Sequence, residues 1–136
     1  MNNQLIKIFL VFALISFSIA GKAEDQKPIE LPTEWDSYYV VLVKEGPNFA
    51  ELQGSEGLRA LMFEHIQYQL GLQKDGIALS AGGFAEAKEG IAGLTLLRAS
   101  SLEEAEEIAH ADPAVKAGRF AVVVYHWYVP GGSLGE

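Results

Sequence analysis

Three residues of this sequence have side chains suited to proton transfer or metal binding: His65, Asp112 and His126. A histidine titrates near neutral pH and is the most common general acid or base in proteins. A carboxylate next to a histidine can hold one tautomer of the ring and stabilise its charged form. These three residues are therefore the candidate catalytic residues of the chain.

Each candidate also has a purely structural explanation. His65 lies on a stripe of mostly apolar residues at helical spacing, where it can be a histidine at the edge of the core. Asp112 precedes Pro113, and Asp-Pro is ordinary capping chemistry at the start of a helix. One carboxylate oxygen can cap the helix while the other accepts from an imidazole, so the two explanations are compatible. His126 can be a polar residue near the end of a strand.

Other kinds of chemistry receive little support. The chain has no cysteine, which excludes disulfides, thiolate metal sites and a cysteine nucleophile. It contains no P-loop, GxSxG, HExxH or EF-hand motif, and we predict no cofactor. A metal site on the two histidines and Asp112 stays open as an alternative, although the three have no ligand spacing. The net charge of −8 disfavours binding to nucleic acid.

The N-terminal residues are typical of a signal peptide. A short basic lead precedes the apolar run Ile8–Ala20, which is too short to span a bilayer comfortably. Small residues then predict cleavage after Ala20 or Ala23, so residues 1–23 are removed and the protein is periplasmic or secreted. The alternative is an uncleaved membrane anchor. After cleavage we expect no contact with the membrane, and residues 24–37 read as a flexible linker with two prolines.

The remaining sequence predicts one α+β domain over residues 38–130, followed by a tail of residues 131–136. Ser100 is the expected N-cap of the second helix, with Glu103 completing a capping box. Residues 44–54 and 84–90 read as loops. The predicted elements are strand 38–43, helix 55–72, strands 77–83 and 91–98, helix 101–111, a short helix after Asp112-Pro113, and strand 119–129. The β-α-β-β-α-β order predicts a ferredoxin-like fold, with a four-stranded antiparallel sheet and two helices on one face.

The first and last strands, expected as the central pair, are apolar on both faces. Helices can cover only one face of such a sheet, so another surface has to cover the other face. A second copy of the chain, packed sheet against sheet, is the economical solution. The sequence thus predicts a homodimer with a β-sandwich or barrel between the subunits.

Several motifs of the sequence are similar to those of a known family. They include Tyr39-Val40-Val41-Leu42 with Gly46-Pro47, then Asp75-Gly76, Leu79-Ser80-Ala81-Gly82 and Ser101-Leu102-Glu103-Glu104-Ala105. The most specific run is Ala111-Asp112-Pro113-Ala114-Val115-Lys116-Ala117-Gly118-Arg119. On these motifs the chain, from about Tyr38 to Pro130, resembles the YciI-like (YCII-related) family.

The resemblance implies a dimeric α/β barrel with a small-molecule ligand. It also implies an active-site histidine and aspartate, which match His65 and Asp112. His126 matches the family's His-Pro-Trp ending less closely, because the proline is missing, and Gly83 stands where many members have proline. The implied activity is acid–base chemistry on a small molecule of the aromatic or lactone-like kind. A non-catalytic periplasmic binding protein is the alternative.

Overall fold

The computed structural model describes residues 27–135, so the predicted signal peptide lies outside the described residues. The elements follow each other in the order β1 (Trp35–Glu45), α1 (Phe49–Leu52), α2 (Leu58–Lys74), β2 (Ala78–Lys88), β3 (Ile91–Leu97), α3 (Leu102–His110), α4 (Pro113–Lys116) and β4 (Phe120–Pro130). Within residues 27–135 no helix is long and apolar enough to cross a membrane.

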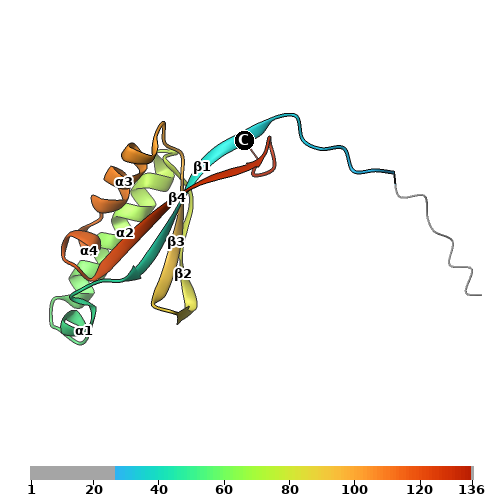
Figure 1. Cartoon of the computed structure of the whole chain (residues 1–136). Coiled ribbons are helices and arrows are strands. Elements are labelled where there is room, and N and C mark those ends of the chain that lie inside the picture. Colours follow the sequence, from blue (N-terminus) through green and yellow to red (C-terminus); the bar gives the residue numbers. More distant parts are fainter. Residues whose placement is uncertain (1–26, 136) are drawn as a thin grey trace, which may run out of the picture. The chain divides into compact units, whose positions relative to one another are not determined.

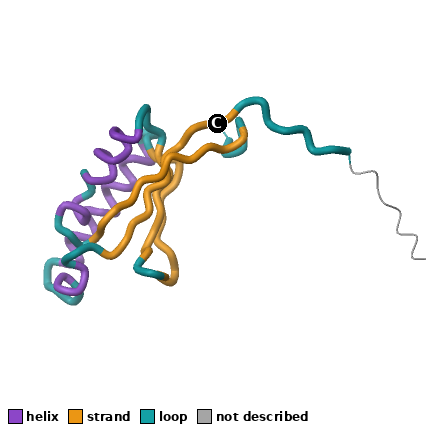
Figure 2. Tube along the Cα trace, in the orientation of Figure 1, coloured by secondary structure: helices purple, strands orange, loops and turns teal. Residues whose placement is uncertain are grey.

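The four strands form one antiparallel sheet in the order β2-β3-β1-β4. Helices α2, α3 and α4 lie on one face of this sheet (Figures 1 and 2). This arrangement confirms the predicted ferredoxin-like α+β fold. One detail of the prediction is wrong, because β4 is an edge strand and the central pair is β1 with β3.

Two strands are longer than predicted. β1 begins at Trp35, inside the predicted linker, because residues 35–37 pair with residues 128–130 of β4. β2 continues to Lys88, so most of the predicted loop 84–90 is strand. The chain reverses at Glu89 and Gly90, whose φ angles of 53° and 75° are those of a tight type I′ hairpin turn.

The helix ends also differ in detail. The short helix α1 forms inside the predicted loop 44–54, and α2 starts at Leu58 rather than at residue 55. Ser101, not Ser100, caps α3, since its side chain accepts from the Glu104 amide at 3.1 Å. The Glu104 carboxylate in turn accepts from the Ser100 amide at 2.6 Å. The capping interaction therefore lies one residue later than predicted.

The main core lies between the helices and the central strands. Ala105 and Ala109 of α3 are buried, and their small side chains let the helix lie close to the sheet. The sheet contributes Leu97, which is 1% exposed, and the remaining buried members are Tyr39, Val41, Leu72 and Ala78. This packing holds the connection from α3 to α4 against α2.

The opposite face of the sheet is apolar and bears no helix within residues 27–135 (Figure 1). Directly paired residues of antiparallel strands share a face. The paired residues Tyr38 with Trp127, Val40 with Tyr125, and Leu42 with Val123 therefore form one surface. Val123, Tyr125 and Trp127 are 38%, 54% and 40% exposed. This surface, defined by these six residues, is called the free sheet face below.

Candidate active site

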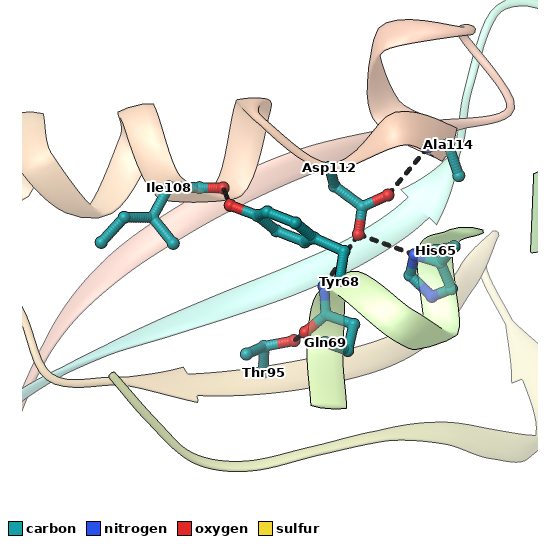
Figure 3. A network of polar contacts seen from close by, with 7 residues as sticks. All are labelled: His65, Tyr68, Gln69, Thr95, Ile108, Asp112 and Ala114. Atoms are coloured by element: carbon teal, nitrogen blue, oxygen red, sulfur yellow. Dashed lines mark hydrogen bonds and ion pairs between the residues drawn. The ribbon is translucent and has the colours of Figure 1, made fainter. Parts of the chain in front are cut away.

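His65 and Asp112, which are 47 residues apart in the sequence, are in direct contact. The Nδ1 atom of His65 lies 2.7 Å from Oδ2 of Asp112 (Figure 3). His65 projects from the first half of α2, and Asp112 stands at the junction of α3 and α4. Their side chains are 16% and 2% exposed. Helix packing thus buries the carboxylate and leaves one edge of the imidazole accessible.

Asp112 has both a structural contact and a contact with the imidazole. Its Oδ1 atom accepts a hydrogen bond from the Ala114 amide at 2.8 Å and caps α4. Its Oδ2 atom accepts from His65 and also from the Gln69 side-chain amide at 2.8 Å. Figure 3 shows both oxygens engaged in this way. The capping role and the contact with His65 are therefore shared between the two oxygens.

Asp112 is ionised at neutral pH. Burial is the largest single influence and opposes the charged form, but hydrogen bonds from His65 and Gln69 outweigh it, with help from the charge of His65 and the Ala114 amide. The net effect lowers the pKa of Asp112 below its ordinary value. An ionised carboxylate only accepts hydrogen bonds, so Nδ1 of His65 carries the proton. In the neutral ring Nε2 then has a free lone pair.

Gln69 and Thr95 complete the polar network around the carboxylate. The Thr95 hydroxyl donates to Oε1 of Gln69 at 2.9 Å, which turns the amide nitrogen of Gln69 toward Asp112. Thr95 is 3% exposed and belongs to the central strand β3. Sequence reasoning missed both residues as part of the site. The available signal was Gln69 itself, a polar residue that interrupts the apolar stripe four positions after His65.

Tyr68 ties α2 to the last turn of α3. Its hydroxyl donates to the Ile108 carbonyl at 2.7 Å, four residues before Asp112. Burial raises the pKa of Tyr68, and the negative charge of Asp112 raises it further. The phenol therefore stays a neutral donor over the physiological pH range, and it holds the helix junction that carries the carboxylate.

A cavity of about 370 Å³ lies between α2 and the sheet, and His65 lines it. The His65 ring packs against Phe120 with 5.2 Å between ring centroids and an interplanar angle of 60°. Gly83 and Gly93 pair across β2 and β3 and also line the cavity. A Cβ at Gly83 would meet only the Ala92 carbonyl at 3.7 Å, so glycine at this position leaves room for a ligand. Gly83 lies within β2, as the predicted strand 77–83 implies.

His126 does not join the pair within one chain. It lies six residues beyond Phe120 on β4, or roughly 20 Å at about 3.3 Å per strand residue. Its ring stacks on Tyr39 with 4.6 Å between centroids, and Nε2 lies 2.6 Å from the Ser37 hydroxyl oxygen. Among the described residues no three His, Cys, Asp or Glu side chains are placed to hold a metal ion. The alternative metal site on His65, Asp112 and His126 is therefore not formed within one chain.

These observations define an α+β protein of the ferredoxin-like class with a His–Asp pair beside a cavity between helix and sheet. The sequence profile of the YCII-related domain matches residues 37–127, more than half of the chain. The chain belongs to the YCII-related domain family.

One solved structure with a similar chain is that of 5-chloro-2-hydroxyhydroquinone dehydrochlorinase from Burkholderia phenoliruptrix AC1100, in complex with 2,5-dihydroxybenzoquinone. The two sequences are 22% identical, and the match covers 66% of this chain and 92% of that chain with a TM-score of 0.47. No curated protein matches the sequence.

Proposed function

We propose that this protein is an acid–base enzyme that moves a proton on a small molecule bound in the cavity. The observation that carries the proposal is the contact of 2.7 Å between His65 Nδ1 and Asp112 Oδ2, with the same histidine lining the cavity. A histidine held in this way presents Nε2 as the proton acceptor. An aromatic or lactone-like ligand suits the mostly apolar walls.

In the proposed reaction a C–H or O–H group of the ligand gives its proton to Nε2 of His65. The ring becomes an imidazolium, and the adjacent charge of Asp112 stabilises it. Gln69 and the Ala114 amide hold the carboxylate in place while the charge develops. The same proton can return to another atom of the ligand, so the cycle needs no cofactor. His126 has no role in this chemistry within one chain.

Deuterium exchange tests the proposal without requiring the natural substrate. Lactones and hydroxyquinones with acidic C–H groups are incubated with the protein in D2O, and NMR follows the loss of the proton signal. We expect His65→Gln and Asp112→Asn to lose the exchange that the unmodified protein catalyses. His110→Gln is the matched control, because His110 is exposed on α3, away from the cavity lining, and its Nδ1 lies 2.8 Å from the Glu106 carbonyl oxygen.

Full exchange activity in His65→Gln would refute the proposal. The non-catalytic alternative predicts a different result. A ligand would then raise the melting temperature to a similar extent in the unmodified protein and in His65→Gln, and it would be recovered chemically unchanged with no deuterium incorporated.

We also propose that the protein acts as an exported homodimer. The exposed Tyr125 and Trp127 on the free sheet face support the dimer, because such a surface is stabilised by burial against a second copy. The apolar run Ile8–Ala20 supports export. Sedimentation velocity tests the dimer. Mass spectrometry of the protein from a periplasmic fraction tests cleavage after Ala20 or Ala23. A full-length chain retained in the membrane would contradict cleavage, and a full-length chain in the cytoplasm would contradict export.

A further inference from the structure

The helix that covers the cavity presents two different stripes to it. His65, Gln69 and Gln73 follow each other at intervals of four residues and form a polar stripe. Residues four apart lie on the same side of a helix, so neighbouring members of this stripe lie one turn above the other. Met62, Ile66 and Leu70 form an apolar stripe beside it, and all six residues line the cavity. A ligand in the cavity therefore meets polar groups along only one side of the helix.

Within residues 27–135 the cavity is lined by no lysine, arginine, aspartate or glutamate. The ionised Asp112 lies directly behind His65, to which it is hydrogen-bonded. An anionic ligand would lose its hydration, find no lysine or arginine among the lining residues and approach a buried carboxylate, which is unfavourable. The chain as a whole is also acidic, with a net charge of −8. The cavity is thus suited to uncharged molecules.

Of the two glutamines on the polar stripe, one is already engaged. The amide of Gln69 binds Asp112 with its nitrogen and Thr95 with its oxygen. Gln73 is partly buried, and no side-chain hydrogen bond from it is found among the described residues. Gln73 is therefore the amide that a ligand can use without breaking the network around Asp112.

The spacing of His65 and Gln73 sets the size of a ligand that contacts both. The two residues are eight positions apart on α2, or about 12 Å along the helix axis at about 1.5 Å per residue. A para-disubstituted benzene ring with one hydrogen bond at each end spans a similar length, about 11 Å, for hydrogen bonds of about 2.8 Å. Gly83 and Gly93, which have no side chain, line the cavity together with the apolar stripe.

We propose that Gln73 is the specificity-determining residue of this cavity and that it binds a neutral polar substituent of an uncharged ring. The opposite end of the ring then faces His65. The proposal rests on the proposed function only in assigning His65 to the reacting end. Binding of the ring by Gln73 does not depend on that reaction and can be measured without turnover.

Two nearly isosteric probes separate the neutral from the anionic case: 4-hydroxybenzamide and 4-hydroxybenzoate at pH 7, titrated against 15N-labelled protein. We expect the benzamide to bind at least about tenfold more tightly, because the benzoate carboxylate finds no lysine or arginine in the cavity wall. Gln73→Leu should weaken benzamide binding about three- to tenfold, the usual worth of one neutral hydrogen bond. Gln67→Leu, on the exposed side of α2, is the matched control and should leave it unchanged.

A second variant tests whether the effect of Gln73→Leu arises from the lost amide or from an indirect change in the structure. Gln73→Lys places a cation at the same position and should reverse the preference in favour of the benzoate. Equal binding of the two probes, no detectable binding of the benzamide at millimolar concentration, or equal effects of Gln73→Leu and Gln67→Leu would overturn the proposal. His65→Gln should keep the preference for the benzamide while losing deuterium exchange, so a failure of the proposed reaction is distinguishable from a failure of this inference.

Discussion

Replacing Asp112 by asparagine changes the charge of the site with almost no change of shape. The carboxylate accepts three hydrogen bonds through two oxygens, and the residue is 1% exposed. Asparagine has only one oxygen. If that oxygen caps Ala114, the new NH2 group faces two donors, on His65 and Gln69. A buried donor without an acceptor costs about 1–3 kcal/mol, and we expect a loss of about 2 kcal/mol in the free energy of unfolding.

The network around residue 112 limits the loss in Asp112→Asn. The Thr95 hydroxyl can accept as well as donate, so the Gln69 amide can turn and offer its oxygen to the new NH2 group. His65 can likewise shift its proton to Nε2 and accept through Nδ1. The second change removes the lone pair that the proposed reaction uses. We therefore expect a moderate loss of stability together with a complete loss of proton transfer.

Urea denaturation as a function of pH measures the contribution of the Asp112 charge. Because the pKa of Asp112 is lowered in the folded protein, its charge stabilises the fold above the unfolded value of about 3.9. This stabilisation is lost as the pH falls toward the lower folded pKa. The difference in unfolding free energy between the unmodified protein and Asp112→Asn should therefore shrink as the pH falls below about 4.

Asp75→Asn makes the same chemical change at an exposed position and serves as the control for Asp112→Asn. It should leave the unfolding free energy within about 0.5 kcal/mol of the unmodified protein. Equal stability of Asp112→Asn and the unmodified protein at pH 7, or a difference that does not change with acidification, would refute the reasoning.

Four other substitutions give independent tests. Thr95→Val removes the donor to Gln69 and should lower the unfolding free energy by about 1–2 kcal/mol in urea denaturation. Gly83→Leu should fill the cavity and abolish binding of 4-hydroxybenzamide in the NMR titration, while the circular dichroism spectrum stays unchanged. Gly71→Ala, inside α2 with no atom within 4 Å of the new Cβ, should raise the unfolding free energy by about 0.5–1 kcal/mol. Tyr125→Glu on the free sheet face should yield monomers in sedimentation velocity, and an unchanged dimer would contradict the proposed interface.

The order and type of the main elements follow from the sequence because alternating apolar residues and helical stripes are local signals. The exact first and last residues of these elements are harder to predict from the sequence. Residues 84–88 are exposed and include the charged Glu86 and Lys88, which is typical of a loop, yet they continue an edge strand up to the Glu89-Gly90 turn. At α3 two adjacent serines and two adjacent glutamates allow two capping registers. The structure has the later one, with Ser101 as the cap and Ala105 and Ala109 buried against the sheet.

The candidate site was predictable to a lesser extent. Asp112 was identified as a cap by its proline, and His65 by its place on an apolar stripe, but only the packing of α2 against the α3–α4 junction brings them within 2.7 Å. Thr95 gives no signal in the sequence, because a buried threonine in a strand needs no functional explanation. His126 lies six residues after Phe120 on the same strand, and this spacing alone separates His126 from a site near the beginning of β4.

The central claim is that Asp112 holds His65 with the proton on Nδ1 and Nε2 free for chemistry. The most direct measurement is a long-range 1H–15N NMR correlation of the histidine ring nitrogens at a pH where His65 is neutral. We predict that His65 shows a protonated Nδ1 and an unprotonated Nε2, and that Asp112→Asn reverses this pattern. A neutral His65 with its proton on Nε2 in the unmodified protein would contradict the account.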